Sequence, residues 1–185
     1  DTVSSPGTVY LQVAGGSGAN LKWTGATDNT WDSTVTNWMD VNSSAPSLFY
    51  SGDNILLDDT AILQDLIVGA GVSVYPATIT NNSEGSSFSI SGAGKISGSA
   101  SIVKQGGSTL TIATANDFTG TVDIQGGILK VASSTALGSG STGTTVEPGA
   151  TLDINGQPIG TETVTASGKG ANDGGAIINT GGKQN

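Results

Sequence analysis

The sequence contains no cysteine and no histidine, and all six of its basic residues are lysines. Without these side chains the chain cannot form a Ser-His-Asp triad, a Cys or His zinc site, or a thiol nucleophile. The absence of arginine removes the bidentate clamp that commonly holds a carboxylate. The formal net charge is −9, so the basic footprint that nucleic acids require is missing, and anionic membranes and acidic polysaccharides are disfavoured. We therefore expect no nucleic acid and no membrane as partner, and favour a neutral ligand.

Charged residues are also scarce, at 11% of the chain, and hydrophobic residues reach only 35%. Glycine, serine, threonine and asparagine fill the remainder, which is typical either of a disordered chain or of a β-structure with many turns. Valine, isoleucine and threonine recur in short clusters, and this favours an ordered, all-β protein. The lack of cysteine fits a secreted protein that must stay competent for translocation without disulfides, so a secreted or cell-surface location is expected. No apolar run is long enough to span a bilayer.

Short apolar alternations punctuated by glycine fill the second half of the sequence. Each runs for about 3–5 residues with the period of two that β-strands show. From Leu110 to Leu129, Leu152 and Ile177 the spacing is roughly 19–25 residues, the range of one β-helix coil. Strands this short pair poorly as isolated hairpins, whereas stacked coils bury each apolar row on the next. The spacing therefore predicts a parallel β-helix, or solenoid.

One continuous domain, residues 1–185, is expected, because no Pro-rich or charged linker interrupts the chain. All three tryptophans lie in the first 40 positions, and glycine, serine and threonine dominate later. Residues 1–75 are therefore expected to form an aromatic-rich cap with the first coils, and residues 76–185 the Gly/Ser/Thr-rich repeat coils.

A set of positions within residues 98–140 forms a recognisable pattern. They are Ile102, Lys104, Gly106, Leu110, Thr111, Asn116, Phe118, Thr119, Gly120, Gly126, Gly127, Leu129 and Val131. The pattern resembles the autotransporter-associated β-strand repeat of the passenger regions of bacterial surface proteins. Residues 23–58, with Trp23-Thr24-Gly25 and Asn37-Trp38, also resemble the opening of such proteins.

This resemblance implies a right-handed parallel β-helix with an aromatic-rich N-terminal cap region. For function it leaves two settings open. One is a passenger or adhesin segment, and the other is a β-helical carbohydrate-binding module of a polysaccharide-degrading enzyme. In both settings the chain is expected to be tethered to further domains of its parent protein.

The residues that cleave polysaccharides are missing or dispersed. A lyase needs a base beside a neutralised uronate carboxylate, and the lysines here are scattered. A glycosidase needs two facing carboxylates, but neighbours such as Asp58 and Asp59 point to opposite faces of a strand. Four further carboxylates converge only if the coils stack them, namely Asp53, Asp65, Asp123 and Asp153. We expect no catalytic residue and no enzymatic activity.

Oxygen ligands for calcium are plentiful around residues 53–59 and at Asn116-Asp117. Turns in which such side chains bond their own backbone are more prevalent, and the sequence favours that interpretation. Calcium is chemically possible, but no cofactor and no metal site is predicted.

The aromatic residues of the first 75 positions are the candidate binding surface. Tyrosine and tryptophan rings stack on the C–H faces of sugars, while neighbouring polar groups bind the hydroxyls. The predicted ligand-binding residues are Trp31, Trp38, Tyr50, Asp53 and Tyr75. Since a solenoid must cap its first coil, the sequence favours a cap or core role for Trp23 and Trp38, and suits Trp31 equally to exposure or burial.

The sequence therefore predicts a non-catalytic carbohydrate-binding module that recognises a neutral polysaccharide of the xylan or β-glucan type. The alternative is a structural passenger or adhesin segment of a bacterial cell-surface protein. An enzyme is the third possibility.

Overall fold

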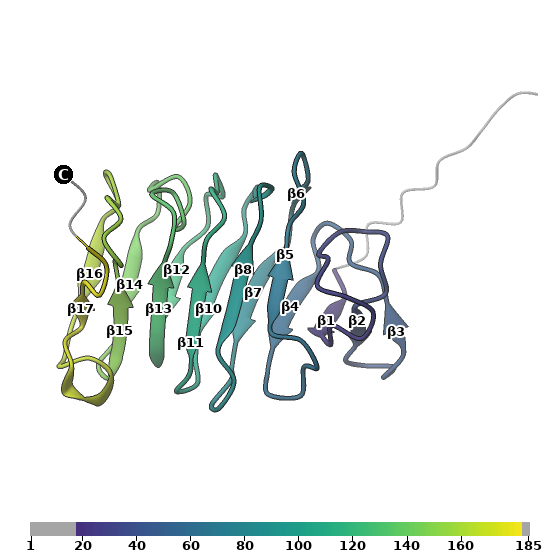
Figure 1. The fold of residues 1–185 in the computed structure, drawn as a ribbon, viewed down its shortest axis with the longest axis horizontal. Helices are drawn as coiled ribbons and strands as arrows, with labels where there is room; N and C mark the ends of the chain where they lie inside the picture. Colours follow the sequence, from purple (N-terminus) through teal and green to yellow (C-terminus); the bar gives the residue numbers. More distant parts are fainter. Residues whose placement is uncertain (1–17, 183–185) are drawn as a thin grey trace, which may run out of the picture.

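The computed structural model describes residues 18–182, which wind into a parallel β-helix (Figure 1). Two long sheets, one of nine strands and one of six, form two faces of the solenoid, and a two-stranded sheet lies at one corner. The coils advance in the right-handed sense that parallel crossovers nearly always show (Figure 1). The predicted all-β, right-handed parallel β-helix is thus confirmed.

The nine-stranded sheet contains, in spatial order, β16 (Val164–Ala166), β14 (Thr144–Val146), β12 (Val122–Ile124), β10 (Ser101–Lys104), β7 (Thr78–Asn81), β4 (Asn54–Leu57), β1 (Asn20–Trp23), β2 (Trp38–Asp40) and β3 (Pro46–Ser47). The six-stranded sheet contains β17 (Ile177–Ile178), β15 (Ala150–Asp153), β13 (Gly127–Val131), β11 (Thr109–Ile112), β8 (Phe88–Ser91) and β5 (Asp65–Ile67). The small sheet pairs β6 (Ser73–Val74) with β9 (Lys95–Ile96), and one short 3-10 helix, η1 (Ala171–Asp173), precedes β17. Nowhere in residues 18–182 is a helix long and apolar enough to cross a membrane.

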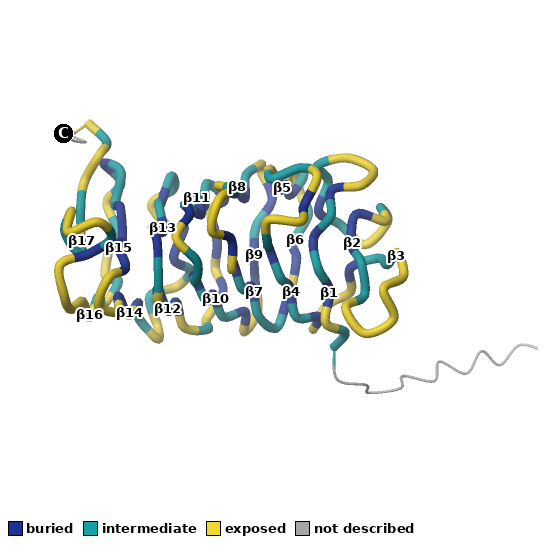
Figure 2. Tube along the Cα trace, turned by 90° about the horizontal axis from the view of Figure 1, so that it is seen from below, coloured by how far each residue is buried: buried dark blue, intermediate teal, exposed yellow. Residues whose placement is uncertain are grey.

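Apolar side chains fill the interior in rows, because inward positions stay in register from coil to coil. Ile55, Ile79 and Ile102 are successive partners in the nine-stranded sheet, and Leu110 pairs with Leu129 in the six-stranded sheet. None of these five side chains is more than 2% exposed, and Figure 2 shows buried positions recurring along successive coils. Full burial of such a side chain contributes about 1.5–3 kcal/mol, so the stacked rows hold the solenoid together.

Strands β1, β2 and β3 close one end of the solenoid. β2 pairs with β1, and β3 with β2, in antiparallel fashion, so the parallel ladder stops there (Figure 1). Pro46 lies in the outermost strand, and because proline has no N–H it blunts that edge against further pairing. The aromatic-rich N-terminal cap that the sequence predicts is therefore present.

Strand pairing is continuous along the described chain, from β1 to β16 in one sheet and from β5 to β17 in the other. Residues 1–17 and 183–185 lie outside the described residues. The single domain 1–185, with its division after residue 75, stays a prediction.

Candidate functional site

The tryptophans predicted to bind sugar lie in the core of the cap. Trp31 is 0% and Trp38 is 1% exposed. The Trp31 ring packs edge-on against Trp38 and against Phe49, with both centroid distances 5.6 Å, and Trp23 meets Trp38 at 4.9 Å. Edge-to-face pairs of this kind stabilise a core beyond the area they bury. The prediction of a stacking surface at Trp31 and Trp38 is therefore wrong, because the first coil encloses both rings.

Asp53 is also buried, and its carboxylate is used by the fold. One oxygen accepts a hydrogen bond from the Ala19 N–H and the other from the Tyr50 N–H, each at 2.8 Å. Asp53 thus ties the turn before β4 to the start of β1. Because both carboxylate oxygens are engaged in these hydrogen bonds, Asp53 is poorly suited to the sugar contact that the sequence predicts.

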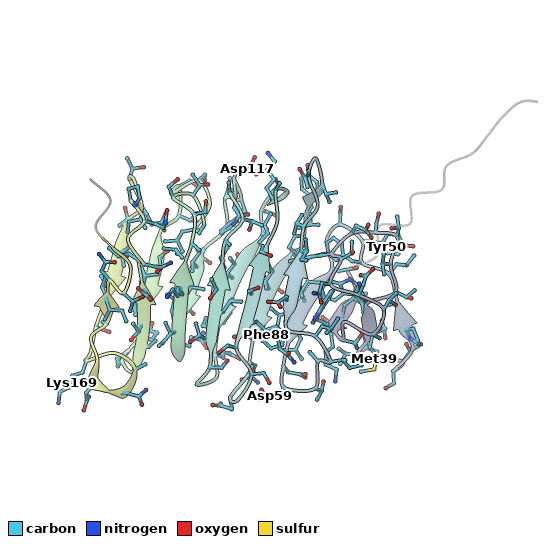
Figure 3. The ribbon with its side chains drawn as sticks, in the orientation of Figure 1. Met39, Tyr50, Asp59, Phe88, Asp117 and Lys169 are labelled. Atoms are coloured by element: carbon cyan, nitrogen blue, oxygen red, sulfur yellow. The ribbon has the colours of Figure 1, made fainter. Side chains whose placement is uncertain are left out.

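The two tyrosines behave differently, since Tyr50 is 59% and Tyr75 is 46% exposed. They lie on neighbouring coils at the same corner, where the Gly52 N–H donates to the Tyr75 carbonyl at 2.8 Å. Figure 3 shows Tyr50 at the surface of the capped end. Of the five predicted binding residues, these two keep accessible rings.

Both tyrosines belong to a surface that we call the third face. It consists of the segments that lead into the strands of the nine-stranded sheet, and it runs along the upper edge of Figure 1. Its residues are 48–53, 68–77, 92–100, 113–121, 132–143 and 154–163.

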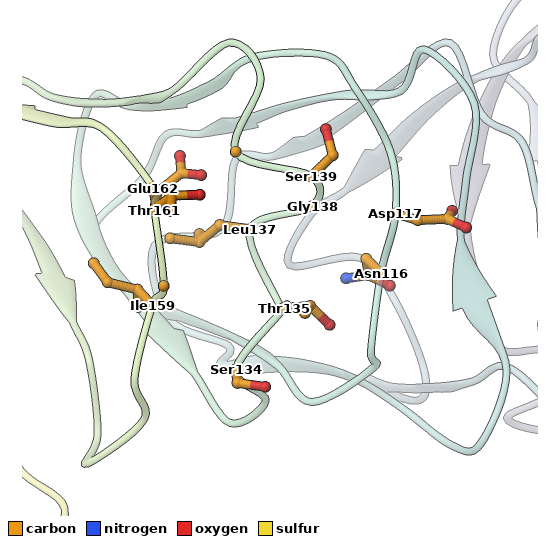
Figure 4. A pocket seen from close by; sticks show the side chains of 12 residues that line it. Asn116, Asp117, Ser134, Thr135, Leu137, Gly138, Ser139, Ile159, Thr161 and Glu162 are labelled. Atoms are coloured by element: carbon orange, nitrogen blue, oxygen red, sulfur yellow. The ribbon is translucent and has the colours of Figure 1, made fainter.

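Three hollows follow one another along the third face. The first, of about 450 Å³, is lined by Tyr50 and Ser73 together with Asp32 from the cap. The second, of about 390 Å³, shares Ser73 with the first and extends to Lys95. The third, of about 250 Å³, lies between successive corners of later coils (Figure 4). The hollows thus form a discontinuous track parallel to the solenoid axis.

The third hollow combines hydroxyl, carboxyl and apolar groups. Figure 4 shows Asn116 and Asp117 on one side and Ile159, Thr161 and Glu162 on the other. One Glu162 oxygen accepts a hydrogen bond from the Thr144 hydroxyl at 2.7 Å. Hydrogen-bond acceptors therefore predominate over positive charge in this hollow.

Lys95 is the lysine that the described third face carries, and its charge is compensated. Its ammonium donates to Asp117, which also accepts a hydrogen bond from the Ser97 hydroxyl. The bond from Lys95, and then that from Ser97, lowers the pKa of Asp117, while Asp117 raises the pKa of Lys95. The pair is charged but mutually neutralised at neutral pH. Lys95 and Asp117 are 22 residues apart in the sequence, the length of one coil. This spacing is the signal from which the pair could have been predicted.

Polar side chains also clamp the coils together inside the repeat. The Asn116 carboxamide accepts from the Ile96 N–H and donates to the Ala136 carbonyl, both at 2.9 Å and both 20 residues away. One side chain thus bridges the coils on either side of its own. The resemblance included Asn116 in its pattern, and this bridge is its physical role.

Lys104 is fully buried, and its ammonium donates to the carbonyls of Gln105, Gly106 and Gly126. Burial lowers the pKa of Lys104 to about 8, and the negative charge of Glu84 opposes this shift. Gly106 adopts a left-handed φ of 57°, and a Cβ there would lie 2.3 Å from the Ser83 carbonyl oxygen. The lysine and the glycine together form a tight corner between coils.

Asp59, in one of the oxygen-rich segments, uses its carboxylate to bind the backbone of the next coil. Its carboxylate accepts hydrogen bonds from the Ser83 hydroxyl and from the N–H groups of Glu84, Gly85 and Ser86. These bonds, led by the one from Ser83, hold the pKa of Asp59 well below its usual range. Among residues 18–182, no group of three or more His, Cys, Asp or Glu side chains is placed to hold a metal ion.

Two of the acidic residues considered for glycoside cleavage, Asp65 and Asp153, lie too far apart to act as a pair. Asp65 and Asp153 share an outward row of the six-stranded sheet, but three further strands separate them. Four strand spacings correspond to about 19 Å, beyond the separation of roughly 5–9.5 Å that glycosidases use. Asp153 instead lies 3.5 Å from Lys130 and accepts a hydrogen bond from the Thr180 hydroxyl at 2.6 Å. Asp123 lies on the other long sheet.

Comparison with known proteins agrees with this architecture. Residues 102–131, which run from β10 to the end of β13, match the family described as Passenger-associated-transport-repeat. The chain is also 28% identical over 173 residues, 92% of its length, to the adhesin BmaC autotransporter of Brucella suis biovar 1 (strain 1330). It covers about 4% of the length of that adhesin.

No solved structure matches the chain significantly. The match to the repeat includes Lys104, Gly106 and Asn116, whose contacts join one coil to the next. The central coils are thus similar to a repeat of bacterial passenger proteins, and the solenoid that contains them is similar to a short segment of an autotransporter adhesin.

Proposed function

We propose that this chain is a non-catalytic structural segment of a bacterial secreted or cell-surface protein, and that it serves as a stiff spacer within a larger adhesin-like molecule. The observation that carries the proposal is the uninterrupted parallel ladder, in which side chains such as Asn116 bond coils on both sides. The similarity to the passenger repeat and to the Brucella adhesin supports the same function.

The length of such a spacer follows from the strand spacing. From β1 to β16 the nine-stranded sheet advances by six parallel steps. At about 4.8 Å per step, the coils separate their two ends by about 29 Å. A packed interior resists compression and bending, so this distance should vary little.

The absence of cysteine makes the spacer proposal directly testable. Cysteines introduced at two exposed positions, Ser43→Cys near the cap and Lys169→Cys near β17, would be the only thiols in the chain. Spin labels on them should give a narrow distance distribution that stays narrow in dilute denaturant until the fold is lost. A distribution as broad as that of an unfolded chain would contradict a stiff spacer. Release of reducing sugar or unsaturated uronate from a polysaccharide would contradict the non-catalytic role.

Glycan binding loses part of its original basis, since Trp31, Trp38 and Asp53 are buried. Tyr50 and Tyr75 remain accessible.

A further inference from the structure

We infer that the third face binds a neutral polysaccharide, which lies along the solenoid axis and stacks on Tyr50 and Tyr75. The inference goes beyond the spacer function and does not depend on it. Three properties of the surface carry it, namely its shape, its aromatic rings and its charge.

The shape of the third face suits a linear polymer. The first two hollows share Val72 and Ser73, so they adjoin. Lys95 lines the second hollow and bonds to Asp117, which lines the third. The hollows therefore follow the direction in which the coils stack, and an extended chain would contact several coils at once.

The two tyrosines offer ring faces at the capped end of this track. Tyr75 lies against Gly98, because a Cβ built on that glycine would come within 3.1 Å of the Tyr75 Cδ1 atom. One edge of the ring thus lies beside the Gly98 backbone, while 46% of the residue stays exposed. Tyr50, on the preceding coil, lines the first hollow and is more exposed still. The negative faces of such rings attract the C–H groups of a sugar.

The charge of the track selects a neutral ligand. Its carboxylates, Asp32, Asp117 and Glu162, would repel an anion, and Lys95 is already paired with Asp117. A basic peptide is a weaker candidate because these carboxylates are engaged. Asp32, for instance, accepts hydrogen bonds from the Thr34 and Val35 N–H groups at 2.7 and 3.1 Å. Sugar hydroxyls can instead use the remaining acceptors without a net change in charge.

Affinity electrophoresis of the full chain tests the inference. The gels would contain xylan, mixed-linkage β-glucan or polygalacturonate, with a gel lacking polysaccharide as reference. We expect retardation by at least one neutral polysaccharide and none by polygalacturonate. The double variant Tyr50→Ala/Tyr75→Ala should bind that polysaccharide about ten-fold more weakly or worse, and Tyr75→Phe should bind like the parent.

The matched control is Ile62→Ala, which removes another exposed apolar side chain, 68% exposed, outside the third face. It should leave retardation unchanged, and circular dichroism should show that every variant keeps its fold. Three results would overturn the inference: no retardation by either neutral polysaccharide, equal retardation of the parent and the double variant, or retardation by polygalacturonate as strong as that by the neutral polysaccharides. None of these results bears on the stiffness measured with spin labels, so the two proposals fail independently.

Discussion

Lys104 holds three backbone carbonyls with a single buried ammonium, and no water is needed to satisfy it. Replacement by methionine would keep the volume of the side chain but leave those carbonyls without a donor. We expect Lys104→Met to lower the free energy of unfolding by about 3 kcal/mol, measured by urea denaturation. The exposed Lys169→Met is the control and should change stability by less than about 0.5 kcal/mol. Equal effects of the two changes would show that the buried contacts contribute little.

Asp59 makes the stability of the fold depend on pH in the acidic range. Its pKa is lowered by bonds that exist only in the folded chain, so the folded state binds fewer protons than the unfolded state as the pH falls below about 4. The stabilising effect is therefore complete above the unfolded pKa and is lost progressively below it. Asp59→Asn should weaken stability at pH 6 and flatten its decline in acid, as followed by thermal unfolding between pH 6 and pH 2. Asp173→Asn, at an exposed position, should reproduce the parent profile. An unaltered decline in Asp59→Asn would rule out this role.

Substitution of Trp31 tests whether this residue stabilises the cap or serves in binding. Because its ring is fully enclosed by Trp38 and Phe49, Trp31→Ala should cost about 3–5 kcal/mol of stability. Tyr50→Ala, which removes an exposed ring, should cost less than about 1 kcal/mol. Thermal unfolding of the two variants measures the contrast. If Trp31→Ala melted like the parent, the enclosed position of the ring would be wrong.

At the scale of the coil, Asn116 connects three successive layers through one carboxamide. Asn116→Ala leaves a buried N–H and a buried carbonyl without partners, and we expect a loss of about 2–4 kcal/mol. Asn42→Ala, in the exposed turn between β2 and β3, provides the control and should be nearly neutral. Chemical denaturation with a two-state fit gives both values, and a neutral Asn116→Ala would mean that water replaces the bridge.

The strands and their stacking were predictable from the sequence, but the environment of the cap was not. The spacing from Leu110 to Leu129 and Leu152 equals one coil because each residue stacks directly on the next. Trp31 lies outside the strands, directly after the isolated bridge that pairs Thr30 with Ile67. The period-two alternation of a strand therefore does not indicate which way the Trp31 side chain points. Its polar neighbours in the sequence also do not show that Trp38 of β2 and Phe49 cover the ring.

The third face illustrates a second limit. It forms from connections whose lengths vary between coils, so residues such as Lys95 and Asp117 meet only after the register of the strands is known. The exposed Tyr50 and Tyr75 were identified from their residue type, while the hollows beside them arise from the backbone paths of several coils.

For the molecule as a whole, stability should vary along the axis. Central strands such as β11 have a hydrogen-bonded neighbour on each side, whereas β17 has one within the described chain and carries Ile177, which is 49% exposed. Local opening is easier where fewer neighbours hold a strand. Hydrogen exchange followed by mass spectrometry should show slow exchange in β10–β13 and faster exchange in β16 and β17. Uniform exchange along the chain would indicate that all coils open together.

The parallel ladder also determines how the molecule responds to a pulling force. Its hydrogen bonds between coils run along the solenoid axis, so an axial load acts on them in series and the weakest junction opens first. Each released coil of about 20 residues would lengthen the chain by up to about 70 Å. Side-chain bridges such as that of Asn116 would set the force at which a given coil yields. The solenoid would then absorb mechanical work in steps, one coil at a time, instead of breaking at a single load.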